Sequence, residues 1–271
     1  MFFIVLYSVA RMTETVAIKP RKRDIFLLKA LNATFKIPFV KVNRERFLRK
    51  ALLSEGCSEE QILRAIEKSP VEVLTPQELK ALALKVRRFH RTSLSALSAA
   101  CGVPGGIFIF VAVPVDTIQF FYHTFVLSQK IAYIYGFPPC MTEDEFRDMM
   151  IIALGVGAGV SKANKAFKFV AKQAKKQLIS QLQKHQELLL PQLLREVCKA
   201  LGVKLTNNTL TQIIRKGIPV ISAVISAIFA YTIFTIESNR IISAFENAAA
   251  GKNDEDIGEI LNADEYSHQE S

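Results

Sequence analysis

The sequence has no tryptophan, only four cysteines and few charged residues, and these shortages exclude several classes of protein. The cysteines, Cys57, Cys101, Cys140 and Cys198, show no CxxC or Cys/His spacing, which argues against a zinc site or a disulfide framework and fits a reducing compartment. Charged residues make up 22% of the 271 and apolar residues 50%. Disordered, collagen-like and coiled-coil chains do not have this composition. We expect a folded domain with a sizeable core and with neither a metal nor a cofactor.

Charge is distributed unevenly along the chain. The formal net charge is +10, but residues 253–271 carry seven acidic residues and no Lys or Arg, so the rest of the chain has a net charge of +17. A body this basic is expected to attract anionic surfaces, whether lipid headgroups, nucleic acid or an acidic protein. Residues 251–271 read as an acidic disordered tail, with the alternative that they screen the basic body.

The first 23 residues are expected to form a flexible or apolar leader. Residues 1–10 are apolar, but no basic segment precedes them and no small-residue cleavage site follows, so we do not predict a signal peptide. Ten apolar residues are also too few to cross a bilayer.

Capping signals predict where several helices begin. The capping box, in which a hydroxyl and a side chain three residues later satisfy each other's free backbone N–H groups, fits three pairs: Ser58 with Gln61, Thr75 with Glu78, and Thr142 with Glu145. Asn43 is a further N-cap candidate, and no segment alternates convincingly as a strand would. We predict an all-α single helical domain over residues 24–250, with a small helical N-terminal part (24–90) and a core of apolar central helices (91–250).

Three uncharged segments mark the apolar part of the chain. Residues 92–115 and 117–129 contain no charge, and the sequence GVPGG at 102–106 should divide them into two helices joined by a turn. Residues 217–236 form the third segment, which is long enough to cross a bilayer. A buried core helix would have the same composition, and we favour it over a single membrane span.

Gly155, Gly157 and Gly159 precede a Ser-Lys pair, as in a phosphate-binding loop. The spacing fits neither the Walker pattern nor the dinucleotide fingerprint, so nucleotide binding is not supported. We interpret the glycines as positions where two helices approach closely.

Several of these motifs occur in an order that resembles the EcsC family of bacterial proteins. They are ACGVPGG at 100–106, VPVDTIQ at 113–119 with His123, SQKIAYIYG at 128–136, GVGAGVSKAN at 155–164 and GIPVISAVIS at 217–226. The resemblance covers about residues 35–245, with Val115 where the family often has a small residue. It implies an α-helical protein whose founding member is encoded beside an ABC transporter linked to protein secretion. It implies no reaction, because the family has no established biochemical activity.

Asp116, Gln119 and His123 are polar residues in an otherwise apolar region, at spacings that place them on nearly the same face of a helix. A carboxylate and an imidazole on one face could transfer protons or bind a cation, and we predict that the three point into one polar pocket. Buried polar groups need partners. The candidates for these partners are Tyr122, Tyr133 and Lys130.

The structural alternative for these residues needs no active site. Asp116 would cap a helix that begins after Pro114, and His123 would be a satisfied core histidine. We favour this interpretation because two titratable groups are too few for a catalytic site.

A helix with seven lysines and no acidic residue is predicted over residues 162–184. At 100° per residue, six of the lysines share one side, opposite an apolar side that includes Phe167, Val170 and Ala171. We call this side the lysine face: Lys162, Lys165, Lys168, Lys172, Lys175 and Lys176. A simple solvated face fits it about as well as a lipid-binding face, and the uncharged segments beside it favour the lipid surface. Nucleic acid fits less well, because arginines and known nucleic-acid motifs are missing.

These observations leave three classes of function. We favour a non-enzymatic accessory protein, cytoplasmic and peripheral to the membrane, that binds anionic lipid and, as the resemblance implies, is linked to a membrane transporter or to secretion. A hydrolase with a polar pocket around Asp116 and His123 is the second class, although GxSxG and HExxH are missing. A secreted effector or pore-forming protein is the third.

Overall fold

The computed structural model describes residues 22–102, 109–140, 142–175, 193–201 and 219–251. The regular structure in these ranges is helical throughout, which confirms the all-α expectation. Residues 1–21 of the leader, residues 252–271 of the acidic tail, and Lys176 lie outside the described ranges, as does the side chain of Lys175.

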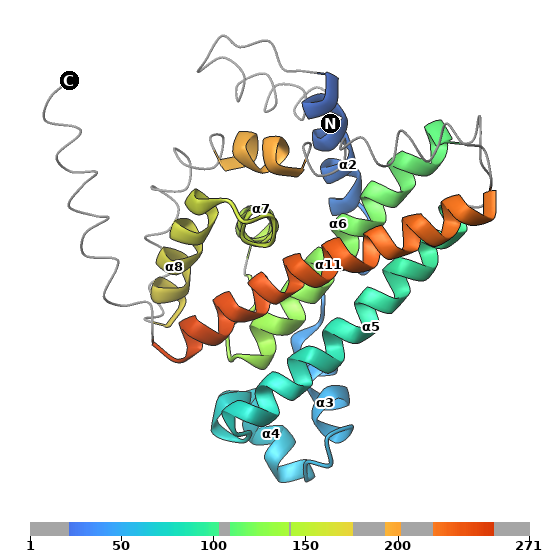
Figure 1. The fold of residues 1–271 in the computed structure, drawn as a ribbon. Coiled ribbons are helices and arrows are strands. Elements are labelled where there is room, and N and C mark those ends of the chain that lie inside the picture. Colours follow the sequence, from blue (N-terminus) through green and yellow to red (C-terminus); the bar gives the residue numbers. More distant parts are fainter. Residues whose placement is uncertain (1–21, 103–108, 141, 176–192, 202–218, 252–271) are drawn as a thin grey trace, which may run out of the picture.

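The helices follow one another as the capping and breaking signals predict (Figure 1). In chain order they are α2 (Lys22–Phe35), α3 (Arg44–Leu53), α4 (Glu59–Glu67), the 3₁₀ turn η1 (Pro70–Glu72), α5 (Pro76–Gly102), α6 (Ile109–Ile134), α7 (Glu143–Ala158), α8 (Ser161–Lys175), a helix over residues 193–201, and α11 (Pro219–Ala249). The break between α5 and α6 confirms that the GVPGG sequence separates two helices.

The three predicted capping boxes and the cap at Asn43 are present. The Ser58–Gln61 and Thr142–Glu145 pairs form reciprocal capping boxes at the starts of α4 and α7. At the start of α5 the backbone N–H of Thr75 donates to Glu78, and that of Glu78 donates back to the Thr75 hydroxyl. The Asn43 side chain accepts from the backbone N–H of Arg46 at 2.8 Å, which caps α3.

Helices α5 and α11 pack side by side and antiparallel, as Figure 1 shows across the centre of the molecule. Their polar contacts fix the direction, because residue numbers rise along one helix as they fall along the other. The pairs are Lys80 with Glu246 at 3.1 Å, Arg87 with Asn239, and Arg91 with Thr235 at 3.4 Å. Helix α6 packs against both α5 and α11, and α3 and α4 lie at one end of α5.

Aromatic side chains fill the core between these helices. Phe125 of α6 is fully buried and stacks on Phe35 of α2, with ring centroids 5.1 Å apart. Phe245 of α11 meets Phe137 and Phe167 edge to face, at 5.2 and 4.7 Å. The core therefore joins α2, α6, α8 and α11 through large apolar contacts.

Glycines in α7 allow neighbouring helices to approach closely, which confirms the interpretation of this motif. A Cβ atom added at Gly155 would lie 2.5 Å from Cβ of Ala163 in α8, closer than any real contact. A Cβ atom at Gly157 would lie 3.2 Å from Cβ of Glu237 in α11. Hydrogen at these positions is what permits the packing.

One local expectation is wrong. Asp116 does not cap a helix, because α6 begins at Ile109 and continues through Pro114. Pro114 lies in the second turn of α6 and has no N–H to donate, so the helix lacks one backbone hydrogen bond there. Arg44 of α3 reaches the C-terminal end of α4. Its guanidinium donates to the carbonyl oxygens of Ile66 at 2.7 Å and Ala65 at 3.4 Å. These carbonyl groups at the end of α4 therefore gain hydrogen bonds from outside the helix.

Helix α5 runs unbroken through residues 90 and 91, the boundary expected between the N-terminal part and the core, so the two parts share this helix.

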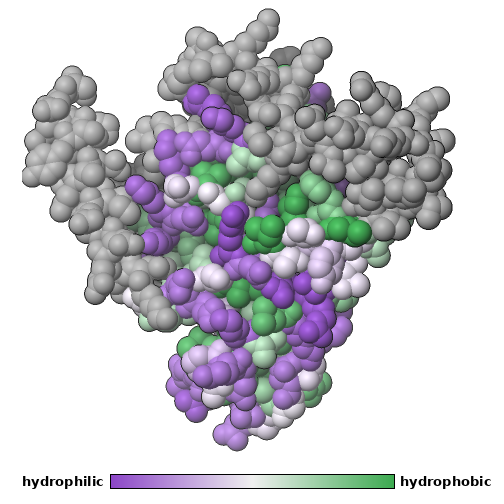
Figure 2. Space-filling model, viewed as in Figure 1, coloured by the Kyte–Doolittle hydropathy of each residue, from purple (hydrophilic) through white to green (hydrophobic). Residues whose placement is uncertain are grey.

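Among the helices in the described ranges, none is both long and apolar enough to cross a membrane. Figure 2 shows hydrophilic and hydrophobic residues intermixed over the face formed by α5 and α11.

The loop between α2 and α3 holds an unusual residue. Phe39 has φ 64, in the left-handed region, and is 87% exposed. A residue with a Cβ atom adopts this conformation at a cost, and burial of the ring does not repay it here.

Candidate functional site

A polar seam lies between α5 and α6, where polar side chains of the two helices meet. We define the polar seam as His90 and Ser98 of α5 with Asp116, Gln119, His123 and Lys130 of α6. Nδ1 of His90 lies 3.0 Å from Nδ1 of His123, and Nε2 of His90 lies 3.0 Å from Nζ of Lys130. His90 is 2% exposed and His123 is 7% exposed. The partner of His123 is therefore another histidine, which the sequence analysis missed.

The donors and acceptors of this chain can be assigned in order. A lysine ammonium only donates, so Nε2 of His90 accepts and its proton is on Nδ1. That proton is donated to Nδ1 of His123, so the His123 proton is on Nε2. Both imidazoles are then neutral. Burial and the charge of Lys130 favour this state and lower the pKa of His90 to about 2 and that of His123 to about 4.

Lys130 is the cation of the chain and is only partly buried. Its ammonium lies 5.7 Å from the ring centroids of both Phe47 and Phe89, which adds cation–π attraction. Burial and the nearby charge of Lys50 lower the pKa of Lys130.

Asp116 belongs to a separate part of the polar seam, two helical turns from His123. The hydroxyl of Ser98 donates to its carboxylate, and burial raises the Asp116 pKa, opposed by that hydrogen bond. Oε1 of Gln119 is buried and has no hydrogen-bond partner among the residues that the structure describes. Tyr133 is directed elsewhere: its hydroxyl donates to the carbonyl oxygen of Val42 at 3.2 Å, and burial raises its pKa to about 12.

The chemistry available at the polar seam is limited. The hydroxyl of Ser98 bonds Asp116, whereas the two histidines bond each other and Lys130, so the seam does not present the hydroxyl–imidazole pair of a serine hydrolase. In the ranges with described side chains, no three His, Cys, Asp or Glu residues are grouped so that they could hold a metal ion.

The lysine face lies on the outer side of α8. Lys162 and Lys165 are exposed, while Lys168 and Lys172 are half-buried. The opposite side is packed into the core: Ala163, Phe167, Val170 and Ala171 are buried. Lys162 also forms an ion pair with Glu196, at 2.9 Å, so its charge is partly neutralised.

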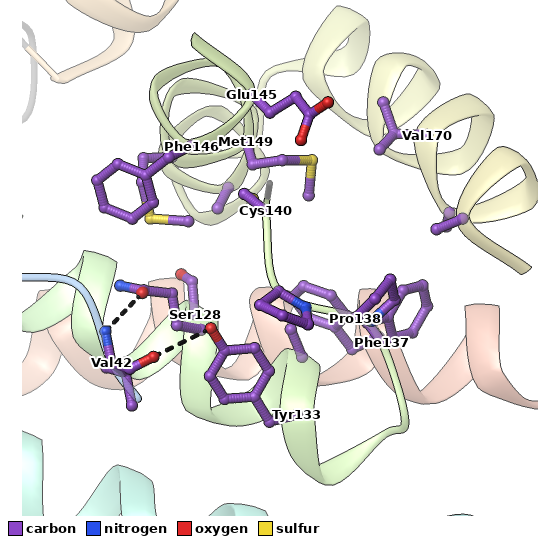
Figure 3. A pocket seen from close by; sticks show the side chains of 18 of the residues that line it. Val42, Ser128, Tyr133, Phe137, Pro138, Cys140, Glu145, Phe146, Met149 and Val170 are labelled. Carbon is purple, nitrogen blue, oxygen red and sulfur yellow. Dashed lines mark hydrogen bonds between the residues drawn. The ribbon is translucent and has the colours of Figure 1, made fainter. Parts of the chain in front are cut away.

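A cavity of about 180 Å³ lies on the inner side of α8, and it was not foreseen from the sequence (Figure 3). Its walls come from α6, α7, α8, α11, the segment 137–140 and residues 41–42 of the loop between α2 and α3. Tyr133 is the one predicted site residue that lines it; Asp116, Gln119 and His123 do not. Cys140 also lines it.

The sequence indicates that His90 is buried but not which residue it contacts. His90 is a polar residue at a helical position whose neighbours Leu94 and Ala83 are core residues, as they would be on one buried side of α5. Pairing it with His123 requires the register of α5 against α6, which the sequence does not state. A cavity has no signal in the sequence, because it is the space that packing leaves.

Comparison with known proteins gave no relative: no family model, no curated protein and no solved structure matches the chain. The resemblance to the EcsC family stays a prediction.

Proposed function

We propose that this protein is a non-enzymatic accessory protein that attaches reversibly to anionic membrane surfaces through the lysine face of α8. The observation that supports the proposal is that α8 has lysines on its outer side and buried apolar residues on its inner side. The apolar side is held in the core, so the lysines are presented outward on a fixed support. A cytoplasmic protein peripheral to the membrane, with a transporter as partner, is what the resemblance to the EcsC family would add.

The expected affinity follows from the number of lysines. Each lysine near an anionic bilayer contributes about 1 kcal/mol. Lys165 and Lys172 together would give about 2 kcal/mol, or roughly a thirtyfold preference for anionic over neutral lipid, before any contribution from Lys168. Lys162 should add less, because Glu196 already pairs with it.

Co-sedimentation with vesicles tests the proposal. Wild-type protein should pellet at low salt with phosphatidylcholine vesicles that contain phosphatidylserine, and not with pure phosphatidylcholine vesicles. High salt should release it, because screening weakens exposed charges. Replacement of Lys165, Lys168 and Lys172 by glutamate should lower the affinity about a hundredfold or more.

A matched control separates the lysine face from total charge. Arg46, Lys50 and Arg88 are exposed on α3 and α5, and their replacement by glutamate changes the net charge equally. This control variant should keep most of the binding. The proposal fails if wild-type protein ignores anionic vesicles at low salt, or if both triple variants lose binding equally.

The same vesicles distinguish the alternatives. A pore-forming protein would release an entrapped dye, and a lipid hydrolase would generate free fatty acid, whereas a peripheral accessory protein would do neither. The polar seam gives the hydrolase less support, because Ser98 and His123 do not meet.

A further inference from the structure

We infer that the cavity on the inner side of α8 binds a single hydrocarbon chain. This inference is independent of the lysine face, because it concerns the opposite side of α8 and is tested without anionic lipid. It is built on the volume of the cavity and the chemistry of its walls.

The walls are apolar and adaptable. Four aromatic rings and two thioethers contribute to them: Phe137, Phe146, Phe167, Phe245, Met149 and Met150. Methionine side chains are unbranched and flexible, so they can adjust to a chain of variable shape. Figure 3 shows side chains from α7, α8 and the segment 137–140 directed into the same space.

The polar side chains in the walls already have partners. Gln129 donates to the carbonyl oxygens of Val40 and Phe125 at 2.8 and 3.0 Å, and accepts from the backbone N–H of Val42 at 2.9 Å. Ser128 donates to the carbonyl oxygen of Thr124 at 2.7 Å, and Tyr133 donates to that of Val42. A polar ligand would have to break these bonds, so the interior favours hydrocarbon.

The volume limits the occupant. An engineered cavity of about 150 Å³ holds a benzene ring, so about 180 Å³ holds one short chain and not two. Each buried methylene should tighten binding about fourfold, until the cavity is full at a length of about eight carbons. The gain should then stop.

Calorimetric titration with linear alcohols is the primary test, since the chain has no tryptophan to report binding by fluorescence. Affinity should rise about fourfold per methylene up to 1-octanol. Affinity that does not change with the length of the alcohol, or no binding of any alcohol, overturns the site.

Filling the cavity gives the decisive variants. Ala171→Leu in α8 and Ala132→Leu in α6 place a larger side chain on the wall and should weaken 1-octanol binding at least tenfold. Ala81→Leu on the exposed side of α5 is the matched control and should bind normally. Thermal unfolding identifies variants that remain folded. If a folded filling variant binds as well as wild type, the inference is wrong.

The chain could belong to a free single-chain amphiphile or to one tail of a bilayer lipid. Native mass spectrometry after incubation with phosphatidylcholine vesicles containing a monoacylglycerol separates the two sources by mass. Retention of either supports the site, and retention of neither contradicts it. Vesicle binding through α8 can fail while 1-octanol still binds, so the two proposals are tested separately.

Discussion

Replacing His123 by asparagine should reduce the acid sensitivity of the fold by a definite amount. His123 has a pKa of about 4 in the folded protein against 6.5 when exposed, because burial and Lys130 oppose its protonation. Between these two pKa values His123 is protonated in the unfolded chain and neutral in the folded protein. The free energy of unfolding therefore falls as the pH falls from about 7 to about 4. Asparagine does not titrate, and its Oδ1 can still accept from Nδ1 of His90.

The magnitude follows from the two pKa values. At about pH 5 the unfolded histidine is protonated and the folded one is not, which costs about 2 kcal/mol. His90, with a folded pKa of about 2, adds a similar cost. The wild-type protein should therefore lose about 4 kcal/mol from the seam between neutral pH and pH 5, and His123→Asn should lose only about 2 kcal/mol.

Other groups titrate in the same range and act in the opposite direction. The Asp148 pKa is raised to about 6 by burial and by nearby Asp144, so its protonation favours the folded state as the pH falls. Burial raises the pKa of Asp116 as well. The quantity to compare is thus the difference between wild type and variant, in which these contributions cancel.

Urea denaturation followed by circular dichroism at neutral pH and at about pH 5 provides the measurement. Phe121→Leu serves as the control, because it destabilises a fully buried position on the same helix without removing a titrating group. Its curve should run parallel to that of wild type. If the His123→Asn curve is also parallel, the histidines are not neutral in the folded state and the assignment of their protons is wrong.

Two further predictions concern backbone positions. Gly155→Ala should destabilise the protein by about 1–3 kcal/mol in chemical denaturation, because the new Cβ overlaps Ala163, and adding Ala163→Gly should recover part of the loss. Equal stability of all three variants would contradict the close approach of α7 and α8. Phe39→Asn should raise the free energy of unfolding by about 0.5–1 kcal/mol, because asparagine tolerates positive φ and the ring is exposed, whereas Phe39→Leu should give no gain.

Local signals in the sequence predicted the fold where the physics is local. A capping box involves residues three apart, so Ser58 with Gln61 and Thr142 with Glu145 could be found without knowing the fold. The break at GVPGG and the two opposed sides of α8 are equally local. Pro114 is an exception. The sequence predicts that a helix begins after it, whereas the proline lies inside α6, which begins at Ile109.

The candidate site was less predictable because its partners are far apart in the chain. The spacing of Asp116 and His123 indicated a shared face, but Ser98 and His90 meet them only through the antiparallel packing of α5 on α6. Arg44 shows the same limit, since its role at the end of α4 depends on how α3 folds back. The cavity is lined by four helices and two connecting segments, and no single one of them indicates it.

The continuous run of α5 has a mechanical consequence. At 1.5 Å per residue, its 27 residues make a rod about 40 Å long. One end of α5 contacts η1 and lies near α3 and α4, while the rest packs against α6 and α11. Unfolding of α5 at one end would weaken the contacts that its other end makes. The N-terminal helices and the central helices should therefore unfold in one cooperative transition.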